Sequence, residues 1–156
     1  MNRLIDDARI LIVDDDAILR MMAGQALRRA GFRVNEAVDG PEGLQSAGEG
    51  DCDLVLLDVM MPGIDGFEVC QKLRQTDRGR DLTIVMLTGL DDSESIEKAY
   101  RVGASDFIPK PINWTLLVHR VRYNLRAALT RNRLAASQGS LARAQSLARM
   151  GNWEWW

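Results

Sequence analysis

The sequence has few cysteines and no long apolar run, which argues against several classes of protein. Its two cysteines, Cys52 and Cys70, form no CxxC pair, so neither a disulfide framework nor a thiolate metal site is indicated. No uncharged apolar stretch approaches the ~18 residues of a membrane span, and the first residues lack the apolar core of a signal peptide. We therefore expect a cytoplasmic protein whose thiols are reduced.

Acidic residues are missing between positions 113 and 150, although the chain of 156 residues has a net charge of −2. Residues 1–112 contain 13 Lys/Arg and 21 Asp/Glu, a net charge of −8, whereas residues 113–150 contain 7 Arg and carry a charge of +7. This split predicts two segments with different roles. We interpret the basic segment first as a solvated helix face, and the alternative is contact with nucleic acid or an anionic surface.

Short apolar segments alternate with helical patterns over the first ~110 residues. The pattern predicts strands at 9–13, 32–37, 54–57, 82–87 and 104–108, and helices at 17–30, 39–50, 65–76 and, after a cap at 91–93, up to residue 102. This alternation is typical of an α/β fold with a doubly wound parallel sheet. Right-handed crossovers bring the carboxyl ends of the strands to one edge, where ligands bind in open sheets.

Polar side chains follow the predicted strands at that edge. They are Asp14 and Asp15 after the first strand, Asp58 after the third, Thr88 after the fourth and Lys110 after the fifth. Two carboxylates ~4 Å apart repel by roughly 4 kcal/mol at an effective dielectric near 20, so Mg²⁺ is the natural complement. A carboxylate beside Mg²⁺ stays ionised and can attack phosphorus, while the lysine balances charge and the threonine binds a phosphoryl oxygen.

Each of these residues also has a purely structural interpretation. Asp14 and Asp15 could cap the helix that begins near Ala17, Thr88 could be a strand-end hydroxyl, and Lys110 a surface lysine. The joint placement of these residues at one sheet edge favours the functional interpretation. The single histidine, His119, stands in a helical stretch without a nearby nucleophile, and we interpret it as structural or solvated.

Four separated motifs resemble the receiver domain of two-component response regulators. They are Val13-Asp14-Asp15, Leu57-Asp58-Val59-Met60-Met61-Pro62-Gly63-Ile64-Asp65-Gly66, Met86-Leu87-Thr88-Gly89 and Gly103-Ala104-Ser105-Asp106-Phe107-Ile108-Pro109-Lys110-Pro111. The resemblance covers residues 7–125. It implies a flavodoxin-like, five-stranded parallel sheet with the strand order 2-1-3-4-5, followed by an extended C-terminal helix.

The resemblance also implies a role for each motif residue. Asp58 is expected to accept a phosphoryl group from a sensor histidine kinase or a histidine phosphotransfer protein. Asp15 and Asp58 are expected to ligate Mg²⁺ directly and Asp14 through a water, with the backbone carbonyl of Met60 as a further ligand. The expected switch residues are Thr88 and Phe107, the expected phosphate-binding residue is Lys110, and the expected cis peptide is Lys110-Pro111. The signal would leave through the face formed by the fourth helix, fifth strand and fifth helix.

Met60 bears on the alternatives to this interpretation. Aspartyl-phosphate hydrolases could use the same carboxylate chemistry, but the second acid that they place two residues after the nucleophile is replaced by Met60. An apolar side chain there cannot position an attacking water, so we expect slow self-dephosphorylation and no enzymatic turnover beyond the chain's own phosphoryl transfer. The other alternative is a DNA-binding regulator that uses the Arg-rich helix, although no helix-turn-helix is visible and basic residues alone bind nonspecifically.

The segment after residue 113 is predicted to form one long amphipathic helix, with Gly139 as a candidate break. We expect residues 126–150 to be a helical linker that pairs as a coiled coil with its own copy in a homodimer, and the alternative is a frayed linker. The expected seam has 3,4 spacing at positions 118, 121, 125, 128, 132 and 135. Residues 141–156 resemble the entry helix and first strand of a PAS sensor domain, so 151–156 are expected to be the truncated start of that domain. A downstream output domain in a longer chain is therefore expected.

Overall fold

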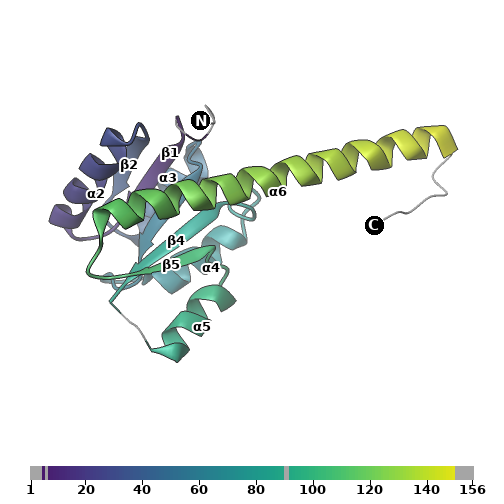
Figure 1. Cartoon of the computed structure of the whole chain (residues 1–156). Coiled ribbons are helices and arrows are strands. Elements are labelled where there is room, and N and C mark those ends of the chain that lie inside the picture. Colours follow the sequence, from purple (N-terminus) through teal and green to yellow (C-terminus); the bar gives the residue numbers. More distant parts are fainter. Residues whose placement is uncertain (1–4, 6, 90–91, 150–156) are drawn as a thin grey trace. The chain divides into compact units, whose positions relative to one another are not determined.

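A single five-stranded parallel sheet forms the centre of the fold (Figure 1). The computed structural model describes residues 5, 7–89 and 92–149, with the side chains of residue 133 and residues 135–149 left out. The strands lie in the order β2-β1-β3-β4-β5. Their bounds are β1 (Arg9–Val13), β2 (Arg33–Ala37), β3 (Leu54–Asp58), β4 (Thr83–Thr88) and β5 (Asp106–Pro109). This confirms the predicted doubly wound sheet and its strand order.

Helices follow every strand, and the first four begin at an aspartate. Their bounds are α2 (Ala17–Arg29), α3 (Gly40–Glu49), α4 (Gly66–Arg74), α5 (Ser93–Arg101) and α6 (Trp114–Arg149). The carboxylates of the four cap residues accept hydrogen bonds from first-turn N–H groups, which would otherwise have no partner in the helix; these caps are Asp16, Asp39, Asp65 and Asp92. The Asp caps therefore determine where each chain segment turns from the sheet edge into a helix.

The core consists of apolar side chains on both faces of the sheet. On one face, alternate residues of β1, β3 and β4 pack with residues of α3, α4 and α5, and the cluster includes Val13, Leu57, Met86, Val69 and Ala99. Because successive strand residues point to opposite faces, the remaining strand residues face α2 and the first turns of α6. The five residues of β3 and the six of β4 are all buried, so these strands hold the site residues at their ends rigidly.

The chain divides into two compact units, residues 1–125 and 126–156. Helix α6 is continuous from Trp114 to Arg149 and passes Gly139 without a break. Its residues Leu117, Val121 and Leu125 are buried in the first unit. The proposed seam was therefore wrong at positions 121 and 125, because these side chains already pack inside their own domain.

Within the described part of the chain, none of the helices combines the length and apolarity needed to cross a membrane. The predicted start of a PAS-like domain at 151–156 lies outside the described residues.

Candidate functional site

The loop after β1 contains three consecutive aspartates with different tasks. Asp16 is the cap of α2: its Oδ1 accepts hydrogen bonds from the N–H groups of Ile18 at 2.9 Å and Leu19 at 3.3 Å. Asp14 and Asp15 are therefore not needed as caps. Asp14 continues the sheet, since its N–H donates to the carbonyl of Ala37 at 3.2 Å.

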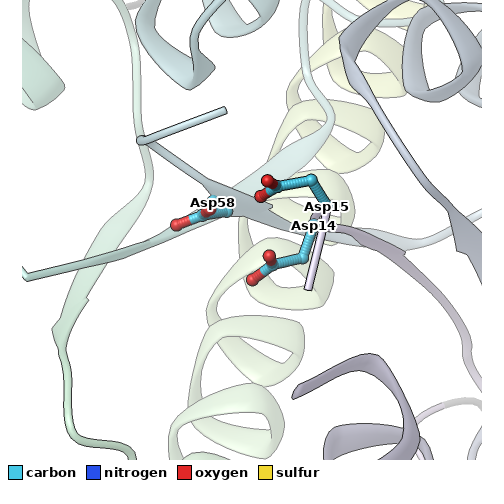
Figure 2. A group of neighbouring side chains, drawn as sticks. All are labelled: Asp14, Asp15 and Asp58. Atoms are coloured by element: carbon cyan, nitrogen blue, oxygen red, sulfur yellow. The ribbon is translucent and has the colours of Figure 1, made fainter. Parts of the chain in front are cut away.

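Asp14, Asp15 and Asp58 form a carboxylate cluster at the edge of the sheet. Each offers one oxygen, and these oxygens all lie within 4.8 Å of one another (Figure 2). Asp14 and Asp58 are buried, whereas Asp15 is exposed. The arrangement follows from the topology, because β1 and β3 are hydrogen-bonded neighbours whose carboxyl ends meet.

Lys110 supplies the positive charge of this cluster. Its Nζ lies 2.9 Å from Oδ1 of Asp58 and 3.6 Å from Oδ2 of Asp14. The backbone N–H of Lys110 donates to the carbonyl of Thr88 at 2.7 Å, which ties the end of β5 to the end of β4. The peptide bond between Lys110 and Pro111 is cis, as the sequence motif predicted.

The ionisation of the cluster reflects burial opposed by local partners. Burial raises the pKa of Asp14 to about 6; the N–H of Asp16 lowers it and the charge on Asp58 raises it. Burial also raises the pKa of Asp58, although the hydrogen bond from Lys110 opposes this. For Lys110, burial lowers the pKa, but the carboxylates of Asp58 and Asp14 outweigh it and the pKa is raised.

The cluster fits a hard divalent cation. Oδ2 of Asp14 is buried and has no hydrogen-bond partner among the described residues, and a buried polar atom of this kind is costly unless a ligand satisfies it. Three carboxylates offer the oxygen ligands that Mg²⁺ prefers. Asp14, Asp15 and Asp58 are thus chemically suited to hold Mg²⁺.

The two expected switch residues lie on neighbouring strands. Thr88 is the buried last residue of β4, and Phe107 is half-buried on β5. Phe107 pairs with Met86, and Pro109 pairs with Thr88, so Phe107 and Thr88 point to the same face of the sheet. Thr88 therefore lies at the carboxyl end of its strand, as Asp58 does, and Phe107 lies two residues before the end of β5. Met60 stands just beyond β3 with an exposed side chain.

Two supporting residues were missed by sequence reasoning. Gly66 begins α4, and a Cβ there would lie 2.3 Å from the backbone oxygen of Asp58, so only glycine allows α4 to start this close to the end of β3. The spacing of Asp58 and Gly66 in the motif was the available signal. Arg20, about one turn into α2, donates from Nη1 to the backbone oxygen of Asp14 at 2.6 Å. Nothing in the local pattern distinguishes Arg20 from a solvent-facing arginine.

A partly buried ion pair links the start of the edge strand β5 to α6. Asp106 accepts hydrogen bonds from Nε of Arg120 at 2.8 Å and from Nδ2 of Asn124 at 2.8 Å. Although burial raises the pKa of Asp106, the hydrogen bonds from Arg120 and Asn124 outweigh it and hold the pKa below its usual range. The pair therefore connects Asp106, the residue before Phe107, to helix α6.

Comparison with known proteins agrees with the fold and the cluster. Residues 10–122 match the family model of the response regulator receiver domain. The chain belongs to this family.

Among curated relatives, the chain is 39% identical over 132 residues to the transcriptional regulatory protein AfsQ1 of Streptomyces coelicolor, covering 85% of this chain and 57% of AfsQ1. It is 40% identical over 134 residues to the response regulator PleD of Caulobacter vibrioides, covering 85% of this chain and 29% of PleD. The chain thus spans about half or less of the length of these relatives.

Solved structures of response regulators have a similar fold. A response regulator from Chloroflexus aurantiacus is similar with a TM-score of 0.73 and 37% identity, over 77% of this chain and 98% of that one. The response regulator TrrA of Thermotoga maritima, in complex with Mg²⁺-BeF, is similar with a TM-score of 0.68 and 32% identity, over 75% of this chain and 98% of TrrA.

Proposed function

We propose that this receiver domain accepts a phosphoryl group on Asp58 from a sensor histidine kinase or a histidine phosphotransfer protein, in the cytoplasm and with Mg²⁺. The observation that carries the proposal is the position of Lys110, whose Nζ lies within 4 Å of carboxylates on both Asp58 and Asp14. One of those oxygens, Oδ2 of Asp14, is buried without a hydrogen-bond partner in the described structure. The site therefore contains one cationic group, the Lys110 ammonium, and a buried carboxylate oxygen, Oδ2 of Asp14, that a second cation could satisfy.

Each residue has a defined task in the transfer. A carboxylate oxygen of Asp58 attacks phosphorus as the bond from phosphorus to the donor nitrogen breaks. Asp15, Asp58 and the Met60 carbonyl would hold Mg²⁺ directly and Asp14 through a water; when bound, the ion offsets the charge of the cluster and the incoming phosphoryl oxygens. Lys110 moves its ion pair from the carboxylate to a phosphoryl oxygen, and Thr88 donates its hydroxyl to another.

The output step follows from the placement of Thr88 and Phe107. The phosphoryl group adds negative charge and strong acceptors beside Thr88. Movement of Thr88 toward them vacates space on the face that Phe107 shares, and Phe107 can repack inward. The change would reach the surface formed by α5, β5 and α6, which leads into the terminal helix.

Met60 sets the expected lifetime of the signal. Its side chain is 62% exposed, stands two residues beyond Asp58 and has no group that can orient an attacking water. We expect a phosphorylated state that persists for minutes or longer. A half-life of seconds would contradict this part of the proposal.

The longer architecture is proposed from the helix and the relatives. We assign residues 7–125 to the receiver, 126–150 to a helical linker, and 151–156 to the start of a PAS-like domain followed by an output domain. AfsQ1, which is named a transcriptional regulatory protein, is longer than the segment it shares with this chain. A homodimer through the terminal helix could not use Val121 and Leu125, because both side chains are buried within one chain.

Phosphorylation by a small donor tests the proposal. The full chain is incubated with acetyl phosphate and Mg²⁺, and its intact mass is compared with that of Asp58→Asn and with a sample containing EDTA. We expect one acid-stable, base-labile phosphoryl group on the wild type when Mg²⁺ is present. We expect none on Asp58→Asn and none in EDTA. An unmodified wild type, or equal modification of Asp58→Asn, would overturn the proposal.

A further inference from the structure

Arg20 lies against the loop that contains the carboxylate cluster, although it belongs to no recognised motif in the sequence. It is on α2, and its side chain is only 14% exposed. Its Nη1 donates to the backbone oxygen of Asp14 at 2.6 Å, and its Nε lies 3.3 Å from Oε1 of Glu36 on β2. The guanidinium therefore joins three elements, which are the loop after β1, helix α2 and strand β2.

The polar groups of Asp14 show what this contact achieves. The N–H of Asp14 donates to Ala37 at 3.2 Å, and its Oδ1 accepts from the N–H of Asp16 at 2.9 Å. With Arg20 on the carbonyl, three of the four polar groups of Asp14 are held by the protein itself. The fourth, Oδ2, faces Lys110 at 3.6 Å and has no hydrogen bond among the described residues.

We propose that Arg20 is a positioning residue for the divalent-cation site. By holding the carbonyl of Asp14, it fixes the peptide that joins Asp14 to Asp15 and presents Oδ2 of Asp14 and the carboxylate of Asp15 to the same point. The inference rests on the proposed function, because it assigns a residue that prepares the site for its ion. Arg20 acts through the loop and touches neither the ion nor the phosphoryl group.

The chemistry of the side chain explains why arginine is needed. A guanidinium is planar, stays charged and directs several N–H groups in fixed directions, so it can hold a carbonyl and a carboxylate on different elements at once. A lysine ammonium is a compact point charge on a flexible stem and has no fixed fork. Glu36, on the edge strand β2, in turn holds Nε of the guanidinium through an ion pair at 3.3 Å.

Magnesium titration of the full chain tests this assignment. Calorimetry in the absence of a phosphoryl donor gives the Mg²⁺ affinity of wild type, Arg20→Gln and Arg20→Lys. Residues that orient ligands through a second layer change metal affinity by about 10–100-fold, so we expect Arg20→Gln to bind Mg²⁺ about tenfold more weakly and Arg20→Lys to recover part of the loss. Hydrogen exchange of the Asp16 amide in EDTA should accelerate in Arg20→Gln, because its acceptor on Asp14 is no longer held.

A second readout separates positioning from general destabilisation. In phosphorylation by acetyl phosphate, Arg20→Gln should raise the Mg²⁺ concentration for half-maximal rate and leave the rate at saturating Mg²⁺ within about twofold of wild type, because only the orientation of the site is lost. If Arg20 had only a structural role, Arg20→Gln would lower the folded fraction and leave the Mg²⁺ requirement of the folded protein unchanged.

Arg28 offers a matched control. It also lies near Glu36, with Nη2 at 3.9 Å from Oε2, but its side chain is 53% exposed and its Nη2 donates a hydrogen bond to the carbonyl of Val34 at 3.3 Å. Arg28→Gln should keep wild-type Mg²⁺ affinity. If Arg20→Gln does not fold, Glu36→Gln takes its place and should weaken Mg²⁺ binding in the same direction. Wild-type affinity in the folded Arg20 variant, or in Glu36→Gln as its substitute, would overturn the inference. A wild type that binds no Mg²⁺ would instead overturn the proposed function.

Discussion

The ammonium nitrogen of Lys110 lies 2.9 Å from Oδ1 of Asp58 and pairs with it at the edge of the sheet. The same nitrogen is 3.6 Å from Oδ2 of Asp14. Lys110 therefore interacts with two of the three carboxylates to which a divalent cation would bind. The lysine and the ion share one negative cluster, so each must lower the affinity of the site for the other.

Removal of Lys110 should affect ion binding and phosphorylation in opposite directions. In Lys110→Ala, Mg²⁺ should bind several-fold more tightly, because the repulsion between two cations in a partly buried site is relieved. Phosphorylation of Asp58 should slow by at least about tenfold, since no ammonium remains to balance the phosphoryl charge. Calorimetry and the rate of mass change measure the two effects. Lys72→Ala on the exposed face of α4 is the control, and weaker Mg²⁺ binding by Lys110→Ala would contradict the arrangement.

Neutralising Asp14 should stabilise the metal-free fold at neutral pH. The pKa of Asp14 is raised to about 6, above the value of about 3.9 in an unfolded chain, so the folded state holds its proton more tightly. The wild type therefore loses stability as pH rises through 6 and regains it as pH falls toward 4. In EDTA at pH 7.5, Asp14→Asn should be more stable than wild type by about 1–3 kcal/mol.

The pH dependence provides the check on that prediction. The advantage of Asp14→Asn should shrink between pH 6 and pH 4, as followed by urea unfolding in EDTA. The variant should also lose most of the stabilisation that Mg²⁺ gives the wild type. Asp77→Asn, at a fully exposed carboxylate, should show neither effect. If Asp14→Asn is instead less stable than wild type at pH 7.5, then burial of the ionised Asp14 carboxylate does not lower the stability of the fold.

The Asp106–Arg120 pair should contribute stability that is lost in acid. The pKa of Asp106 is lowered by the hydrogen bonds from Arg120 and Asn124, so its contribution is present above the unfolded value of about 3.9 and disappears as pH falls through the folded pKa. Arg120→Ala leaves the buried carboxylate with one partner fewer and should cost about 2 kcal/mol at pH 7. The difference from wild type should narrow below about pH 4. Arg126→Ala, on an exposed position of α6, should be near neutral.

Gly66 and Gly48 should respond oppositely to a methyl group. A Cβ on Gly66 would lie 2.3 Å from the backbone oxygen of Asp58 and 2.8 Å from the Cα of Val59, so Gly66→Ala must shift α4 away from the site and should cost at least about 2 kcal/mol. A Cβ on Gly48 within α3 would meet nothing within 4 Å, so Gly48→Ala should stabilise by about 0.5–1 kcal/mol. Denaturant unfolding of both variants measures the contrast, and equal effects would contradict the close approach of α4.

Much of the fold and the cluster could be predicted because topology alone brings them together. The carboxyl ends of parallel strands meet at one edge of the sheet. Asp14, Asp58 and Lys110 could therefore be placed close together without knowledge of their side-chain conformations. The local pattern could not distinguish the capping aspartate from the two in the cluster. The structure assigns the cap to Asp16, because it alone has its carboxylate over the first turn of α2.

Tertiary contacts explain what the sequence could not show. The 3,4 spacing along α6 suggested one seam for a second helix, yet Val121 and Leu125 are buried in the chain's own core. An apolar stripe has the same period whether it faces the domain or a partner. Arg20 was missed for a similar reason, since its partners Asp14 and Glu36 reach it only when β1, β2 and α2 have assembled.

The most direct test of the account is the location of the phosphoryl group. The chain is phosphorylated with acetyl phosphate and Mg²⁺, the acyl phosphate is reduced with borohydride to give homoserine at the modified residue, and the peptides are sequenced by mass spectrometry. The account predicts homoserine at position 58 and at no other aspartate, and none when EDTA replaces Mg²⁺. Homoserine at position 14 or 15, or an equal yield without Mg²⁺, would contradict it.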